Sequence, residues 1–187
     1  MQATQKNYHH FIDGSQVTGT SGRTHAIYNP SQGSVSGTVT LATSTEVDAA
    51  IASAANALGE WSSMNPQRRA RVLFNFKALV EANADELALL IAEEHGKVIA
   101  DAHGDIQRGL DVIEFACGVP HLSKGEYTQG AGPGIDVYSM RQPVGVVAGI
   151  NPFNLDSGFG IQSAFAPKDS LAVRSLFLRW LVIDEIS

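Results

Sequence analysis

The sequence predicts an α/β protein in which a parallel sheet begins late in the chain and stays incomplete. Three segments that differ in composition and hydrophobic pattern support this prediction. Residues 8–41 are rich in Gly, Ser, Thr and β-branched types, as in short strands joined by tight turns. Residues 45–116 show helical periodicity, and residues 144–150 form a continuous apolar run, as in a strand buried on both faces. We therefore expect a β-rich amino-terminal segment, residues 8–41, which we call the lead. A four-helix layer, a hairpin strand and the first strand of a parallel sheet are expected to follow it.

Turn signals divide the first segment into short strands. Asp13-Gly14, Ser21-Gly22 and Asn29-Pro30-Ser31 are typical of tight turns. Because tight turns join neighbouring strands antiparallel, we expect an antiparallel lead.

The first two helices carry start and stop signals. Thr45, with Asp48 three positions later, resembles a capping box, and Gly59 is expected to end this helix. The second helix is expected to start with Asn65 as its cap and Pro66 at its first position, where the missing N–H costs nothing.

The third and fourth helices are marked in the same way. Asn83 with Glu86 repeats the capping-box pattern, and Gly96 suits the left-handed position after a helix end. The fourth helix is expected to run from about Ile99. Its apolar residues recur on one side, which predicts the buried face: Ala102, Ile106, Gly109, Leu110, Ile113 and Ala116.

Two different strands are expected after the helices. Residues 130–134 form a glycine-rich loop, and the strict alternation of residues 135–141 predicts a half-exposed strand. The apolar run of residues 144–150 is where a Rossmann-like nucleotide-binding core would begin.

Composition and charge argue against several classes of function. Hydrophobic residues make up 44% and charged residues 17%, which is a globular composition. The formal net charge of -6 argues against nucleic acid and against an anionic membrane surface as partners. The longest apolar stretch, residues 176–186, contains Arg179 and Asp184 and is shorter than the roughly 20 residues that span a bilayer. One cysteine and scattered histidines give no metal-binding pattern and indicate a reducing, cytoplasmic compartment.

Two side chains on the fourth helix are candidates for catalysis or ligand binding. Cys117 is the only thiol, but its place on the apolar side, next to Ala116, favours a buried structural residue over a nucleophile. Arg108 precedes Gly109 on a helix with few other cations, so its guanidinium has room to bind a carboxylate. A solvated surface arginine is the alternative.

The strongest motif follows the apolar run. A strand that ends in Pro152-Phe153-Asn154 places Asn154 at the carboxyl edge of the sheet, where open α/β folds bind ligands. The amide of Asn154 could donate to a developing oxyanion, or the residue could cap a helix. Residues 158–163 imitate a dinucleotide-binding fingerprint, but they do not follow the strand directly, which favours a flexible loop.

At these residues the chain resembles the aldehyde dehydrogenase superfamily, whose members carry the strand motif P-x-G-V-x-x-x-I-x-P-[FW]-N. Residues 143–154 match this motif closely. The resemblance covers about residues 8–154, through Phe11-Ile-Asp-Gly14, Asn29-Pro30, the helix that ends in Trp61, Arg68-Arg69-Ala-Arg71 with Leu73-Phe-Asn-Phe76, and Glu94-His-Gly-Lys97. Within the superfamily, the chain resembles the coenzyme-A-acylating methylmalonate-semialdehyde dehydrogenases at Arg108-Gly109, Glu114-Phe-Ala116, Gly118-Val-Pro-His-Leu122 and Lys124-Gly-Glu126.

The resemblance implies an activity and the residues that serve it. It implies an aldehyde-dehydrogenase-like fold, Asn154 as the oxyanion donor, Asn151 and Phe153 against the nicotinamide cofactor NAD, and Arg108 as the residue that holds the substrate carboxylate. It also implies that a cysteine thiolate attacks a small aldehyde, that a hydride passes to NAD, and that the acyl group leaves on coenzyme A with loss of carbon dioxide. The products would be propionyl-CoA or acetyl-CoA.

The sequence departs from the family after Asn154. We expect residues 1–154 to be the amino-terminal part of the NAD-binding and oligomerisation region, and residues 155–187 to be a divergent tail of unknown fold, as in a truncated or frameshifted product. Cys117 does not match the catalytic cysteine, so the isolated chain is expected to be inactive and to bind NAD weakly or not at all. The alternative is a non-catalytic module that associates with itself or with a full-length relative through residues 135–141 and the apolar tail.

Overall fold

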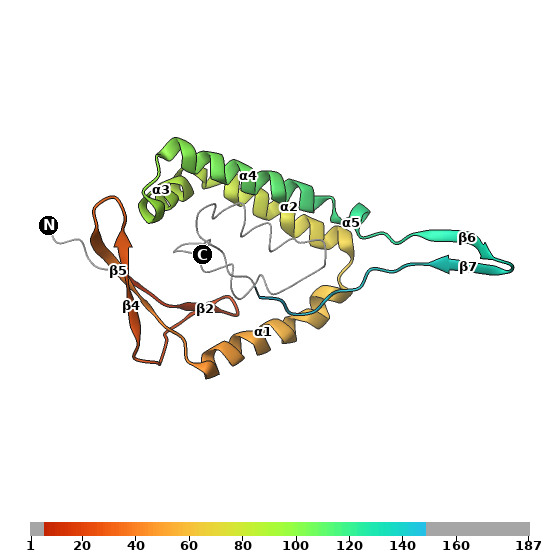
Figure 1. Cartoon of the computed structure of the whole chain (residues 1–187), viewed down its shortest axis with the longest axis horizontal. Coiled ribbons are helices and arrows are strands. Elements are labelled where there is room, and N and C mark those ends of the chain that lie inside the picture. Colours follow the sequence, from red (N-terminus) through yellow and green to blue (C-terminus); the bar gives the residue numbers. More distant parts are fainter. Residues whose placement is uncertain (1–5, 149–187) are drawn as a thin grey trace.

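A computed structural model describes residues 6–148 of the 187-residue chain. Short strands come first, helices follow, and a long hairpin projects from one end (Figure 1). This order gives the mixed α/β architecture that the sequence predicts. The elements are β1 (Lys6–Tyr8), β2 (His10–Ile12), β3 (Ser15–Val17), β4 (Thr24–Asn29), β5 (Ser34–Thr40), α1 (Ser44–Ser63), α2 (Pro66–Ala82), α3 (Ala84–His95), α4 (Ile99–Cys117), α5 (Val119–Leu122), β6 (Tyr127–Gly132) and β7 (Ile135–Tyr138).

The strands of the lead form two small sheets. β2 and β3 make an antiparallel hairpin, whose turn residues Asp13 and Gly14 have positive φ values of 53° and 72°. β4 pairs antiparallel with β5, but β1 pairs parallel with β5. The prediction of a wholly antiparallel lead was therefore wrong. Gly37 allows the parallel pairing, because a Cβ there would lie 2.5 Å from the carbonyl oxygen of Lys6.

α1 starts earlier and ends later than the sequence indicates. Its cap is Thr43, not Thr45, and Glu46 completes the capping box. Both carboxylate oxygens of Glu46 accept hydrogen bonds, one from the backbone and hydroxyl of Thr43 and the other from those of Thr20. Glu46 thus ties the lead to the first turn of α1. Gly59 does not end the helix, because glycine only weakens a helix interior and α1 continues to Ser63.

The predicted signals around α2 and α3 have mixed outcomes. Asn65 caps α2 as predicted, with its side-chain oxygen accepting from the backbone of Gln67 at 2.9 Å. The Asn83–Glu86 capping box is wrong, because Asn83 instead donates its amide to the Leu79 carbonyl at the end of α2. Gly96 ends α3 in the left-handed region, with φ 72°, as predicted.

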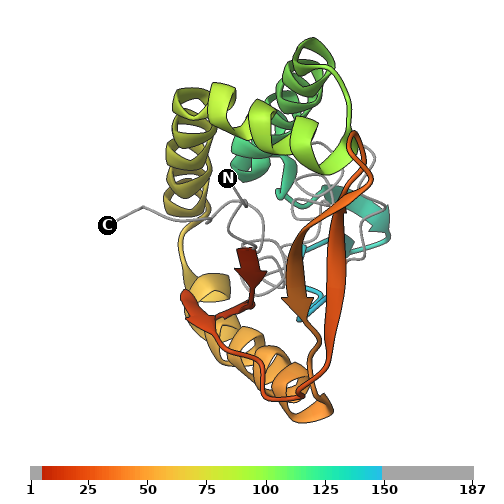
Figure 2. The same ribbon diagram turned by 90° about the vertical axis from the view of Figure 1, so that its left-hand side faces the viewer.

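The core lies between α4 and the helices α2 and α3, which pack against it. All the residues predicted for the inner face of α4 are buried: Ala102, Ile106, Gly109, Leu110, Ile113 and Ala116. α1 lies apart from these three helices, on the far side of the lead (Figures 1 and 2). The four predicted helices therefore exist, and three of them share a common core. β4 and β5 run from the end of α3 toward the start of α1 (Figure 2).

The end of the described region differs from the expected pair of strands. β6 and β7 form an arm that extends away from the helices (Figure 1), and β7 stops at Tyr138 instead of continuing to residue 141. Every residue of β7 is exposed, so the expected half-buried pattern is wrong. Over the described residues 144–148, the predicted apolar strand has no paired neighbour and forms no strand. A strand of that kind depends on neighbouring strands to bond its backbone and cover its faces.

Candidate functional site

The structure places one of the four predicted site residues. Arg108 lies in the middle of α4. Asn151, Phe153 and Asn154 lie outside the described residues, as do the loop of residues 158–163 and the tail of residues 155–187. The candidate site therefore rests on Arg108 and its surroundings.

Arg108 belongs to a cluster of three charges centred on Asp105. Asp105 is only 3% exposed. One of its carboxylate oxygens accepts a hydrogen bond from Nη1 of Arg108 at 2.5 Å, and the other accepts from Nζ of Lys97. The Arg108 side chain is 60% exposed, whereas that of Lys97 is 21% exposed. The cluster thus anchors a solvent-facing guanidinium on a buried carboxylate.

Local structure explains how the three side chains meet. Asp105 and Arg108 are three residues apart on α4, a spacing that places side chains on neighbouring positions of a helix surface. Lys97 lies in the short link between α3 and α4, directly after Gly96. A Cβ on Gly96 would lie 3.2 Å from Cγ of Pro30, so the β4–β5 turn packs closely against the link that carries Lys97.

Asp105 and Lys97 were not among the site residues predicted from the sequence. A signal was present, because Asp105 follows Ala102 by three positions and precedes Gly109 by four, which puts it on the apolar face of α4. A carboxylate on a buried face needs a cationic or hydrogen-bonding partner. The nearest cation on the helix was Arg108 itself.

Cys117 has the structural role that its position predicts. The residue is buried at the end of α4, within the helical core. Burial raises the pKa of its thiol, and the carboxylate of Glu114 raises it further, while Lys77 opposes both effects. A nucleophilic cysteine needs the opposite environment, with access to substrate and a lowered pKa. Cys117 therefore does not provide a thiolate for catalysis.

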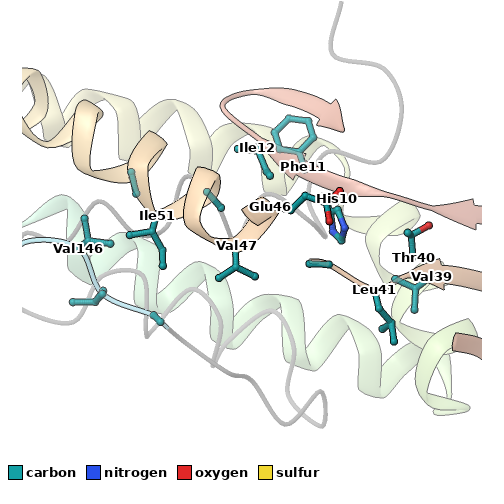
Figure 3. A pocket seen from close by; sticks show the side chains of 15 residues that line it. His10, Phe11, Ile12, Val39, Thr40, Leu41, Glu46, Val47, Ile51 and Val146 are labelled. Atoms are coloured by element: carbon teal, nitrogen blue, oxygen red, sulfur yellow. The ribbon is translucent and has the colours of Figure 1, made fainter. Parts of the chain in front are cut away.

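A separate cavity of about 570 Å³ lies between the lead, the first half of α1 and residues 146–148 (Figure 3). Its walls are mainly aliphatic, and its ionisable lining residues are His10 and Glu46. Glu46 is already satisfied by Thr20 and Thr43, and these hydrogen bonds lower its pKa to about 2. The cavity thus offers an apolar surface without a nucleophile.

The arm presents a second exposed surface. Its large apolar residues lie open to solvent, and Tyr138, the most exposed of them within the strands, is 69% exposed. The Tyr127 hydroxyl donates to Asp136 across the hairpin at 2.5 Å, and Asp136 also accepts from the backbone of Gly130. These bonds lower the pKa of Asp136 and raise that of Tyr127. The arm is thus internally braced but otherwise uncovered by the described residues.

Residues 6–148 contain neither a candidate metal site nor a candidate membrane-spanning helix. No group of three or more His, Cys, Asp or Glu side chains in this range could hold a metal ion. Across the same range, no helix combines the length and the hydrophobicity that crossing a bilayer requires.

Comparison with known proteins gives one consistent result. The sequence model of the aldehyde dehydrogenase family matches residues 17–164, which includes ten residues beyond position 154. A malonate-semialdehyde dehydrogenase of Pseudomonas aeruginosa is 44% identical over 146 residues, which are 78% of this chain and 29% of that protein. The human mitochondrial acylating methylmalonate-semialdehyde/malonate-semialdehyde dehydrogenase is 44% identical over 144 residues, 77% of this chain and 27% of that protein.

Solved structures agree with these sequence matches. A structure described as a methylmalonate-semialdehyde dehydrogenase of Sinorhizobium meliloti complexed with NAD has a TM-score of 0.81 and 53% identity, covering 86% of this chain and 33% of that one. The methylmalonate-semialdehyde dehydrogenase of Oceanimonas doudoroffii has a TM-score of 0.80 and 43% identity, with 84% and 32% covered. The chain therefore spans about three tenths of the length of the relatives that it matches.

Proposed function

Because this chain belongs to the aldehyde dehydrogenase family, we propose that it forms the amino-terminal portion of an NAD-dependent, coenzyme-A-acylating malonate- or methylmalonate-semialdehyde dehydrogenase. Relatives with these names are 44% identical to it. The observation that carries the proposal is the exposed guanidinium of Arg108, anchored by buried Asp105. These semialdehydes differ from simple aldehydes by a carboxylate, and an anchored arginine is suited to bind one.

The proposed reaction needs this recognition. A semialdehyde with a carboxylate two carbons from the aldehyde carbon, coenzyme A and NAD are converted to acyl-coenzyme A, carbon dioxide and NADH. NAD, when bound, accepts the hydride. Arg108 holds the carboxylate and so orients the aldehyde, while coenzyme A takes the acyl group. This orientation converts binding energy into proximity at the reacting carbon.

Three residues after the described range are proposed to bind the reacting oxygen and the cofactor. By resemblance to the family, Asn154 donates its side-chain amide to the developing oxyanion, and Asn151 and Phe153 lie against the nicotinamide. The 187 residues alone are proposed to be inactive, because their single thiol, Cys117, is buried and has a raised pKa. The single cysteine also supports a reducing, cytoplasmic location.

The proposal is tested by exchanging segments with an active relative. Residues 6–148 replace the matching segment of the Pseudomonas aeruginosa malonate-semialdehyde dehydrogenase, and NADH formation is followed with malonate semialdehyde and with propanal. We expect an active chimaera in which Arg108→Met lowers kcat/KM for malonate semialdehyde at least tenfold and leaves propanal within about twofold. Gln107→Met, at the exposed position directly before Arg108 on α4, is the matched control.

Two results would count against the proposal. An active chimaera in which Arg108→Met affects both aldehydes equally assigns Arg108 a structural role only. NADH formation by the purified 187-residue chain with malonate semialdehyde and coenzyme A refutes the proposed inactivity of that chain.

The second candidate function is association through the arm. It is favoured by the exposed apolar side chains on β6 and β7 and by the two unpaired edges of this hairpin within the described structure. Such edges pair readily with another strand. The partner would be a second copy of the chain or a full-length relative.

Light scattering tests this second candidate on the whole chain. Val137→Lys, on the exposed arm, is expected to convert an oligomer into a monomer, while Thr128→Lys, its direct cross-strand partner, places the same charge at a polar position. A wild-type chain that is monomeric and does not bind a full-length relative excludes the candidate.

A further inference from the structure

The charge balance around Asp105 is unusual for a simple surface ion pair. Asp105 is buried at the centre, and two cations share it, one on each carboxylate oxygen. A buried carboxylate is costly to hold without compensation, and either cation could supply that compensation. Summed over these three side chains alone, the formal charge is +1.

The exposures of the two cations show where the surplus charge is presented. Lys97 is mostly covered, whereas Arg108 is 60% exposed. Asp105 engages Arg108 through Nη1 alone. Because a guanidinium has five N–H donors, Nε and Nη2 remain for a ligand, and no described residue accepts from them.

We propose that Lys97 is a positioning residue for carboxylate recognition at Arg108. Lys97 neutralises Asp105, so that Asp105 can hold the guanidinium in one orientation without cancelling its attraction for an anion. Without Lys97, the Asp105–Arg108 pair is formally neutral and competes with the substrate carboxylate. This inference rests on the proposed function, because it assumes that Arg108 binds a carboxylate.

The test uses the complete 187-residue chain and nuclear magnetic resonance of the Arg108 Nε–Hε group, assigned by its loss in Arg108→Lys. The probes are malonate, which carries carboxylates, and malonamide, its neutral analogue, at constant ionic strength. In the wild type, the Arg108 signal is expected to shift with malonate and to shift much less with malonamide.

The variants separate charge from folding. Lys97→Met is expected to weaken malonate binding about three- to eightfold, as Coulomb's law gives for one charge about 7 Å from the ligand at a dielectric constant of about 40 to 80. Lys97→Arg keeps the charge and should stay within about twofold of the wild type. Lys77→Met removes a lysine from the ion pair with Glu81 on α2 and is the matched control, also expected to stay within twofold.

A double variant tests the role of the Lys97 charge even if Lys97→Met folds poorly. Asp105→Asn combined with Lys97→Met removes both charges and leaves the surplus charge on Arg108, so malonate affinity should return to within about threefold of the wild type. Unchanged affinity in Lys97→Met, or no recovery in the double variant, overturns the role of Lys97. A wild-type signal that responds equally to malonate and malonamide instead overturns the proposed role of Arg108.

Discussion

Replacing Gly59 with alanine is expected to stabilise the folded chain by about 0.5 to 1 kcal/mol. Gly59 lies inside α1, and a Cβ added there meets no atom within 4 Å. Because the space is open and the backbone is helical, the main effect of the substitution is the smaller conformational entropy of the unfolded chain. For a protein of this size, the melting temperature should rise by roughly 1 to 4 °C. Thermal unfolding followed by circular dichroism measures this rise.

Two other glycines provide controls for this measurement. Gly104 is equally open inside α4, so Gly104→Ala should give a similar rise. Gly125 lies at the base of the arm, where a Cβ would be 1.7 Å from the carbonyl oxygen of Ser139, so Gly125→Ala should be destabilising. If Gly104→Ala raises the melting temperature and Gly59→Ala lowers it, α1 ends at Gly59, as the sequence pattern indicated, and its extension to Ser63 is wrong.

Three further predictions follow from the core, the cap and the thiol. Ile113→Ala should cost about 2 to 5 kcal/mol in urea unfolding, because Ile113 is fully buried, while Ile113→Val should cost about 0.5 to 1.5; equal effects would contradict tight packing. Glu46 has a folded pKa of about 2 against an ordinary 4.5, so its stabilising effect is complete above pH 4.5 and is lost as the pH falls toward 2. Glu46→Gln should therefore flatten the acid side of the unfolding midpoint against pH, and an unchanged slope would refute this. Cys117 should react with a thiol reagent only after denaturation, since burial raises its pKa, and rapid reaction in the native chain would contradict the structure.

The sequence predicted the helical core better than the strands, and the reason is the range of the interactions. The inner face of α4 follows from a period of 3.6 residues, and burial acts on every turn of that helix, so the pattern and the structure coincide from Ala102 to Ala116. The parallel pairing of β1 with β5 joins segments about 30 residues apart, and no local pattern encodes it. The cap of α1 was misplaced by two residues because Thr43 and Thr45 are both suitable caps. The Glu46 carboxylate that completes the box with Thr43 is also bonded by Thr20, which is distant in the sequence.

The contrast between local patterns and contacts of distant segments also explains which site residues were predicted. Arg108 was identified from its residue type and from a family resemblance, but its anchoring depends on Asp105 and Lys97, and Lys97 comes from another segment. All three stand on or beside the best-packed helix of the described chain, with Ile106 and Leu110 buried next to them. A binding group held by a packed helix is oriented more accurately than one on a loop. The proposed carboxylate recognition therefore depends on the α2–α3–α4 core, and a core substitution such as Ile113→Ala that loosens α4 should weaken discrimination between malonate and malonamide along with stability, whereas changes in the arm should leave that discrimination intact.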